Sequence, residues 1–202
     1  MLGFYNYTVI LTYIGMLTGL YGITQVMASN RMAALICLMV AGVCDMFDGK
    51  VASTRQRTKS EKRFGIQIDS LSDLICFGVL PAFIAYEAYK GVLRFVPSGL
   101  YVLCALIRLA WFNVDEEERQ EKDAKSRKVY RGLPVTLSAA IIPIVMGICG
   151  RLNLDAGIVG ACTLVIMAIA FITPFKIQKP KFSTMIIMLI IGLIGVCALL
   201  FL

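Results

Sequence analysis

The chain has 202 residues, of which 58% are hydrophobic and 16% are charged. Its mean hydropathy is +0.79, whereas a soluble domain is only about half apolar and about a quarter charged. This composition excludes an ordinary soluble globular domain. We predict an all-α integral membrane protein, because the backbone polar groups of a segment in lipid must hydrogen-bond within their own helix.

Seven apolar segments are long enough to cross a hydrocarbon core about 30 Å thick. We expect membrane helices at 6–28, 32–49, 66–89, 95–114, 133–150, 156–175 and 183–202. They predict a bundle of about six to seven transmembrane helices that forms one domain over residues 1–202. The segment 183–202 either belongs to the core of this bundle or braces it from outside.

The first predicted helix carries Gly15, Gly19 and Gly22 at helical spacing. Small residues on one helix face let a neighbouring helix approach closely. We therefore expect these glycines to form a packing face, and we assign them no chemistry.

The basic residues are distributed unevenly between the two ends of the predicted helices. Fifteen Lys and Arg residues lie in the connections 49–65 and 115–131 and in the loop before 183, against four in the opposite connections. The positive-inside rule places the first group in the cytoplasm. We therefore expect a multi-pass protein of the cell membrane. Its net charge of +7 should lie mainly on the cytoplasmic side, where it suits anionic lipids or an anionic substrate. The basic residues lack interleaved aromatic residues, so we expect no nucleic-acid partner.

Two pairs of aspartates lie where predicted helices meet the cytoplasmic face. Asp45 and Asp48 are three residues apart at the end of the second helix, and Asp69 and Asp73 are four apart at the start of the third. Residues at these spacings share a helix face, so each pair can direct both carboxylates the same way. The two helices are joined by a cytoplasmic connection, so we expect the four carboxylates to converge there.

Such a cluster needs cations, because like charges repel and burying them near lipid is costly. The basic residues of the connection could pair with the aspartates, but they follow Gly49 into a connection that should be solvated and would have to fold back. Divalent cations are the alternative that we favour, because hard oxygen ligands suit Mg²⁺, Mn²⁺ or Ca²⁺. Four carboxylates match a two-metal site that clamps the attacking and leaving oxygens of a displacement.

The aspartates belong to a longer pattern, D-x-x-D-G-x-x-A over 45–52 followed by G-x-x-x-D-x-x-x-D over 65–73. This pattern resembles the signature of the CDP-alcohol phosphotransferases, a family of membrane enzymes. The resemblance implies a catalytic domain that binds two divalent ions, usually Mg²⁺ or Mn²⁺, through Asp45, Asp48, Asp69 and Asp73. It implies that Asp48, Gly49, Ala52 and Gly65 line the binding site of a cytidine nucleotide. It also implies that Asp73 is the general base that deprotonates the acceptor alcohol.

The chain departs from that signature in two ways that bear on substrate binding. The family usually has Arg after the Ala, where this chain has Ser53, and the stretch to the next glycine is longer than usual. Either Arg55 or Arg57 could take over the missing contact with an anionic group.

Two further segments, ALIRLAWFNV at 105–114 and YRGLPVTLSAA at 130–140, resemble those of bacterial phosphatidylserine synthases within this family. The resemblance implies CDP-diacylglycerol and serine as substrates. Arg108 would clamp the carboxylate of serine or the lipid-linked phosphate, with Asn113 and Arg131 completing the acceptor pocket. Alternatively, Arg108 pairs with an acid such as Asp115 or extends to the interface.

Other interpretations stay open at this point. The acceptor could be glycerol 3-phosphate or an inositol species, because the basic connections could bind a phosphorylated alcohol. A divalent-cation transporter could also bury carboxylates, although it would be expected to place them along a path through several helices. A homodimer is a further expectation from the resemblance.

Overall fold

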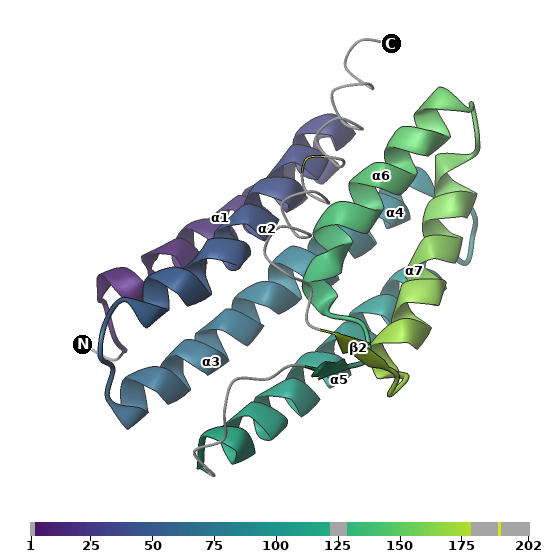
Figure 1. Ribbon diagram of the computed structural model, residues 1–202. Coiled ribbons are helices and arrows are strands. Elements are labelled where there is room, and N and C mark those ends of the chain that lie inside the picture. The colour runs from purple at the N-terminus through teal and green to yellow at the C-terminus, as the bar shows by residue number, and fades with distance from the viewer. Residues whose placement is uncertain (1–2, 122–128, 179–189, 191–202) are drawn as a thin grey trace.

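The computed structural model describes residues 3–121, 129–178 and 190. Figure 1 shows long helices packed side by side, with the N-terminal helices along one edge of the bundle. The longer helices are α1 (Tyr7–Met27), α2 (Arg31–Ser53), α3 (Lys59–Asp73), α4 (Leu80–Ala88), α5 (Phe95–Glu121), α6 (Ser138–Arg151) and α7 (Ala156–Ile172). Short elements complete the fold: the π-helix η1 (Leu74–Val79), the 3-10 helix η2 (Val135–Leu137) and the strands β1 (Val129–Arg131) and β2 (Lys176–Gln178).

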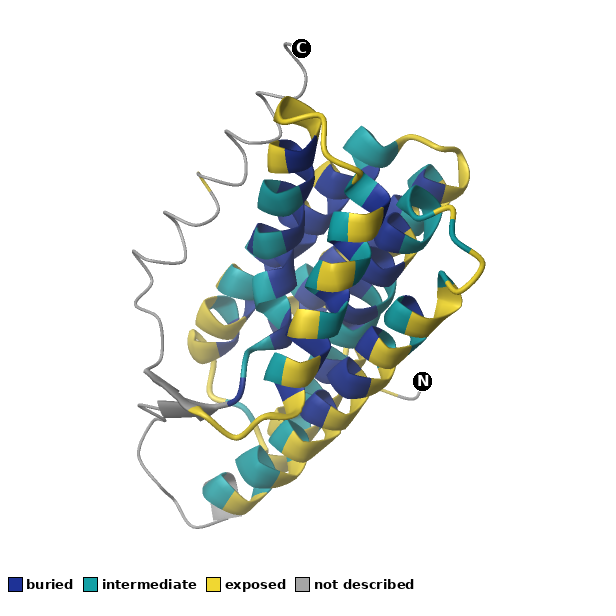
Figure 2. Ribbon diagram, turned by 90° about the vertical axis from the view of Figure 1, so that its right-hand side faces the viewer, coloured by how far each residue is buried: buried dark blue, intermediate teal, exposed yellow. Residues whose placement is uncertain are grey.

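The protein is a multi-pass helical membrane protein, as predicted. Within the described residues, four helical runs are long and apolar enough to span a membrane: 7–27, 31–53, 59–88 and 95–119. Two shorter apolar runs cover 135–151 and 156–172. Buried residues face the interior of the bundle and exposed ones the outside (Figure 2), where many of the exposed side chains are large and apolar, as lipid contact requires. The seventh predicted helix, 183–202, lies outside the described residues apart from Ile190.

The predicted helix ends at the connections expected over 49–65 and 115–131 were wrong, because three helices extend beyond their apolar segments. α2 ends at Ser53 and α3 begins at Lys59, so the connection expected over 49–65 is only 54–58. α3 begins early because of a capping box: Thr58 Oγ1 accepts from the backbone N–H of Glu61 at 3.2 Å, and Glu61 Oε2 accepts from that of Thr58 at 2.8 Å. α5 likewise continues past 114 to Glu121, where Arg119 pairs with Glu116 one turn earlier.

The run from Lys59 to Ala88 is continuous, although it contains Pro81 and changes to a π-helix at η1. Proline has no N–H, so the carbonyl four residues earlier, that of Phe77, loses its usual helical partner. Tyr101 Oη on α5 donates to this carbonyl at 2.7 Å, and Ser138 Oγ on α6 donates at 3.2 Å. Two neighbouring helices therefore anchor the point at which the helix is irregular.

A small antiparallel ribbon joins the segment after α5 to the segment after α7. Tyr130 pairs with Ile177, and Arg131 pairs with Lys176. Gly132 follows β1 with a φ of +76°, and a Cβ there would lie 2.9 Å from the carbonyl oxygen of Phe171. The chain can turn into η2 and α6 at this point because residue 132 is glycine. This ribbon was not predicted from the sequence.

The predicted glycine face of α1 is confirmed. A Cβ on Gly15 would lie 3.1 Å from Cys44 Cβ on α2, and one on Gly19 would lie 2.6 Å from Cys76 Sγ on η1. A Cβ on Gly22 would approach Leu80 to 2.8 Å. α1 therefore packs closely into the groove between α2 and the run that follows α3, which holds the acidic ends of both helices against it.

We expect Gly19→Ala to destabilise the fold by about 1–3 kcal/mol, because the added methyl group would overlap Cys76 on both its side chain and its backbone. The midpoint of thermal unfolding in detergent measures this effect. Gly49→Ala is the matched control, because a Cβ at Gly49 meets nothing within 4 Å, and its midpoint should not fall. Equal midpoints for the two variants would contradict the close packing of α1.

Candidate active site

The four aspartates lie on two helices, α2 and α3, that are joined by the short connection 54–58. Asp45 and Asp48 are on one face of α2, and Asp69 and Asp73 are on one face of α3. Asp45, Asp48 and Asp69 each offer a carboxylate oxygen, and these oxygens all lie within 4.8 Å of one another. Asp73 joins them in lining a narrow cavity of about 10 Å³.

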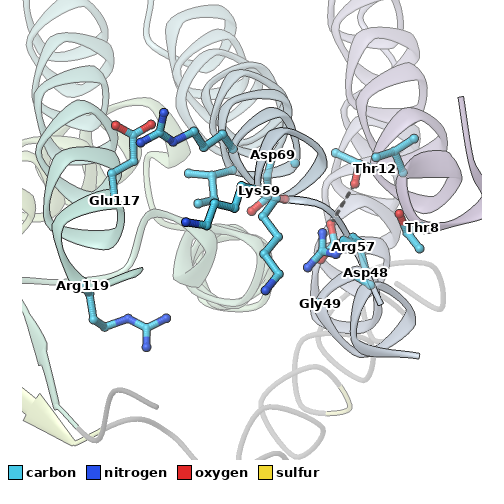
Figure 3. A pocket seen from close by; sticks show the side chains of 15 residues that line it. Thr8, Thr12, Asp48, Gly49, Arg57, Lys59, Asp69, Glu117 and Arg119 are labelled. Carbon is cyan, nitrogen blue, oxygen red and sulfur yellow. Dashed lines mark hydrogen bonds between the residues drawn. The ribbon is translucent and has the colours of Figure 1, made fainter. Parts of the chain in front are cut away.

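Helix α1 forms the third wall of this acidic cluster. Thr12 Oγ1 donates to Asp48 Oδ2 at 3.2 Å (Figure 3), and Ser72 Oγ on α3 donates to the backbone carbonyl of Thr12 at 3.4 Å. Asp48 is only 9% exposed. Thr12 could not be identified from the sequence, because a single threonine in an apolar helix carries no signal of its place in a site.

The donor set fits a divalent metal. Three carboxylates converge closely from two helices, and the salt bridges found within the described residues leave all four aspartates without a basic partner. Converging carboxylates are the hard oxygen ligands that Mg²⁺, Mn²⁺ and Ca²⁺ prefer. Asp45, Asp48 and Asp69 thus form a candidate metal site.

A larger cavity of about 740 Å³ opens beside the acidic cluster. Asp48 and Asp69 line it together with Gly49, Ala52 and Gly65. Its remaining walls include side chains of both signs from the α2–α3 connection, α3 and α5: Arg57, Lys59, Lys62, Arg63, Glu117 and Arg119. Figure 3 shows Thr12, Asp48 and Arg57 on one side and Glu117 and Arg119, from α5, on the other. The cavity therefore combines a site for cations with basic groups suited to an anionic ligand.

Arg108 lies apart from this cavity. Its side chain is buried, at 5% exposure, and its guanidinium carbon lies 5.6 Å from the ring centroids of both Trp111 and Phe112. These distances are those of cation–π contacts. A Cβ on Gly132 would lie 3.5 Å from Arg108 Nε, so the arginine packs beside the turn after β1.

Asn113 connects α5 to α3. Its Oδ1 accepts from Ser70 Oγ at 2.5 Å, and its Nδ2 donates to Gln67 Oε1 at 3.3 Å. Neither Asn113 nor Arg108 is among the described residues that line the 740 Å³ cavity. Arg131 is the last residue of β1, and its side chain lies outside the described part of the structure. The acceptor pocket assigned to these three residues stays a prediction.

A comparison with known families matches residues 5–201 to the model of the CDP-alcohol phosphatidyltransferases. The chain belongs to the CDP-alcohol phosphatidyltransferase family. The match covers the acidic cluster, the adjacent cavity and all the described helices, so the resemblance found in the sequence is confirmed over nearly the whole chain.

Several individual members of the CDP-alcohol phosphatidyltransferase family are also similar to the chain, and those named here are CDP-diacylglycerol–serine O-phosphatidyltransferases. The one from Saccharomyces cerevisiae is 34% identical over 119 residues, which are 57% of this chain and 42% of that protein. The one from Methanocaldococcus jannaschii is 26% identical over 167 residues, 83% of this chain and 72% of that protein. The one from Helicobacter pylori is 33% identical over 135 residues, 64% of this chain and 51% of that protein. The chain thus spans about half the length of two of these three relatives.

Proposed function

We propose that the chain transfers the phosphatidyl group of CDP-diacylglycerol to the hydroxyl of L-serine, giving phosphatidylserine and CMP. The observation that carries the proposal is the juxtaposition of the acidic cluster with a cavity of about 740 Å³ lined by basic side chains. Family membership supports the reaction type, and the names of the similar proteins support serine as the acceptor. The same chemistry with glycerol 3-phosphate or an inositol species is the alternative.

Two divalent ions, Mg²⁺ or Mn²⁺, would be held by Asp45, Asp48, Asp69 and Asp73. When bound, they would neutralise the charge of the diphosphate and of the departing CMP. Thr12 fixes the orientation of Asp48 through its hydrogen bond. Gly49, Ala52 and Gly65, which line the larger cavity, would leave room for the nucleotide against the backbone of α2 and α3.

In the proposed reaction, a carboxylate oxygen of Asp73 takes the proton of the serine hydroxyl. The hydroxyl oxygen then attacks the phosphorus that bears the diacylglycerol, and the bond from this phosphorus to the oxygen of CMP breaks. One displacement completes the transfer without a phosphorylated enzyme, which agrees with the absence of histidine from the sequence. Arg108, Asn113 and Arg131 would act on the acceptor side.

The charge distribution supports a cell-membrane protein whose site opens to the cytoplasm, because the ends of α2 and α3 that carry the aspartates adjoin the most basic connections. One catalytic domain over 1–202 fits the extent of the family match. The homodimer stays a prediction that light scattering of the purified protein would test.

An acceptor assay tests the proposed function. The purified chain is supplied with CDP-diacylglycerol, Mn²⁺ and one of three labelled alcohols: serine, glycerol 3-phosphate or inositol. We expect labelled phosphatidylserine and an equal amount of CMP with serine, and little labelled lipid with the others. If another alcohol labels the lipid preferentially, that alcohol is the acceptor, and the reaction type stays that of the family. Absence of CMP release with every acceptor would contradict the proposed reaction itself.

A further inference from the structure

The site lacks a cation at position 53, where the family signature carries an arginine. Ser53 is exposed at the end of α2, and its hydroxyl donates to the carbonyl oxygen of Lys50 at 2.6 Å. The side chain is therefore turned back onto its own helix. The next arginines along the chain are Arg55 and Arg57, in the connection 54–58, and the structure distinguishes their surroundings.

Arg55 is engaged by a carboxylate outside the cavity. Its Nη2 lies 3.4 Å from Glu61 Oε1, and it is not among the residues that line the cavity. Glu61 binds three more donors: the backbone N–H of Thr58 at 2.8 Å, Thr58 Oγ1 at 3.1 Å and Asn6 Nδ2 at 3.2 Å. Glu61 thus joins the start of α3, the α2–α3 connection and the residue that caps α1.

Arg57 points the other way. It lines the cavity together with Gly49, Ala52 and Gly65, and its Nη1 lies 3.1 Å from where a Cβ of Gly65 would be. Figure 3 shows its side chain beside Asp48 at the α2 side of the cavity. No ion pair of Arg57 occurs in the described part of the chain. A guanidinium placed in this way presents a planar set of donors that matches a phosphate.

We infer that Arg57, rather than Arg55, supplies the cation that binds the diphosphate of the cytidine nucleotide, and that Glu61 is the residue that positions it. The inference rests on the proposed function, because it names the anion. Glu61 binds Arg55 and caps α3, which fixes the five-residue connection between α2 and α3 with Arg57 directed inward. Asn6 extends this restraint to the start of α1. The end of α2 and the starts of α1 and α3 together restrain the connection that carries Arg57, whose side chain lies over Gly65.

Binding of CDP to the full-length protein in detergent with Mn²⁺, measured by calorimetry, compares the two arginines directly. We expect Arg57→Gln to weaken CDP binding by about ten- to a hundredfold, the usual cost of a hydrogen bond to a charged group. Arg55→Gln should weaken it by less than about threefold, because it disturbs only the restraint on the connection. Arg151→Gln is the matched control. Arg151 is the last residue of α6 and does not line the cavity, so this substitution should leave CDP binding unchanged.

Two substitutions of Glu61 test its positioning role. Glu61→Ala removes every contact of the carboxylate, so we expect the KM for CDP-diacylglycerol to rise several-fold while kcat changes by less than about twofold. Glu61→Gln keeps an acceptor for the capping box and should restore most of the lost affinity. A loss of stability alone would lower the amount of active protein, hence the apparent kcat, without changing KM.

The outcomes separate this inference from the proposed function. If Arg57→Gln binds CDP as the unmodified chain does, or if Arg55→Gln is the weaker binder, the assignment of Arg57 is wrong, whatever the acceptor assay shows. If Glu61→Ala leaves KM unchanged, the positioning role is wrong. Failure of the unmodified chain to release CMP would instead contradict the proposed function, and it is measured without any variant.

Discussion

Asp73→Asn is expected to lower kcat by about 10²- to 10⁴-fold, the usual contribution of a general base. Asparagine has nearly the shape of aspartate but cannot accept the proton of the attacking hydroxyl. Asp73 ends α3 and lines the narrow cavity, yet it lies outside the group of three carboxylates whose oxygens are within 4.8 Å of one another. We therefore expect CDP to bind to this variant at saturating Mn²⁺ nearly as it binds to the unmodified chain.

Initial rates of CMP release and CDP calorimetry on the same preparation measure the two effects. Asp155→Asn is a suitable control, because Asp155 caps α7 by accepting from Gly157 and Ile158, and asparagine can cap a helix in the same way. Its turnover should be unchanged. A turnover by Asp73→Asn within about tenfold of the unmodified chain would rule out Asp73 as the base.

The second large effect is expected from Asp69→Asn and Asp45→Asn, which each remove a carboxylate of the three-membered group. Substitutions of residues that only orient a metal ligand typically weaken metal binding by about 10- to 100-fold. Loss of a ligand itself should raise the Mn²⁺ concentration for half-maximal CMP release by at least about a hundredfold. Saturating Mn²⁺ should restore much of the rate of these two variants, whereas Asp73→Asn, which also removes the general base, should remain slow at saturating Mn²⁺.

A Mn²⁺ titration of CMP release at saturating CDP-diacylglycerol measures this shift. Thr12→Val provides a graded comparison, because it removes the hydrogen bond to Asp48 but leaves all four carboxylates in place. Its shift should be smaller than that of either aspartate variant. An unaltered metal requirement in Asp45→Asn and Asp69→Asn would mean that the acidic cluster is not the metal site.

The membrane-spanning parts of the fold could be predicted from the sequence because length and hydropathy decide whether a segment crosses lipid. The helix ends could not, because polar side chains determine them. The capping box of Thr58 and Glu61 starts α3 within a stretch of charged residues that hydropathy assigns to a loop. The ribbon of β1 and β2 was missed for a related reason: strands of three residues are too short to show alternation of apolar and polar side chains.

The arrangement of the aspartates could be predicted because helical periodicity determines which residues share a face. The spacing of Asp45 and Asp48, and that of Asp69 and Asp73, was sufficient to bring them together once α2 and α3 were neighbours. Contacts between helices that are distant in sequence were not predictable in this way. Thr12 lies 36 residues before Asp48, and Asn113 lies 43 residues after Ser70, so only the packing of α1 and α5 reveals their partners.

Diffraction at the manganese absorption edge, from crystals grown with Mn²⁺ and CDP, tests the central claim most directly. We predict anomalous density between the carboxylates of Asp45, Asp48 and Asp69, with the diphosphate of CDP beside it in the larger cavity. The account would be contradicted if no anomalous density appeared between these carboxylates when both Mn²⁺ and CDP are supplied. It would also be contradicted if only lysine and arginine side chains contacted them under these conditions.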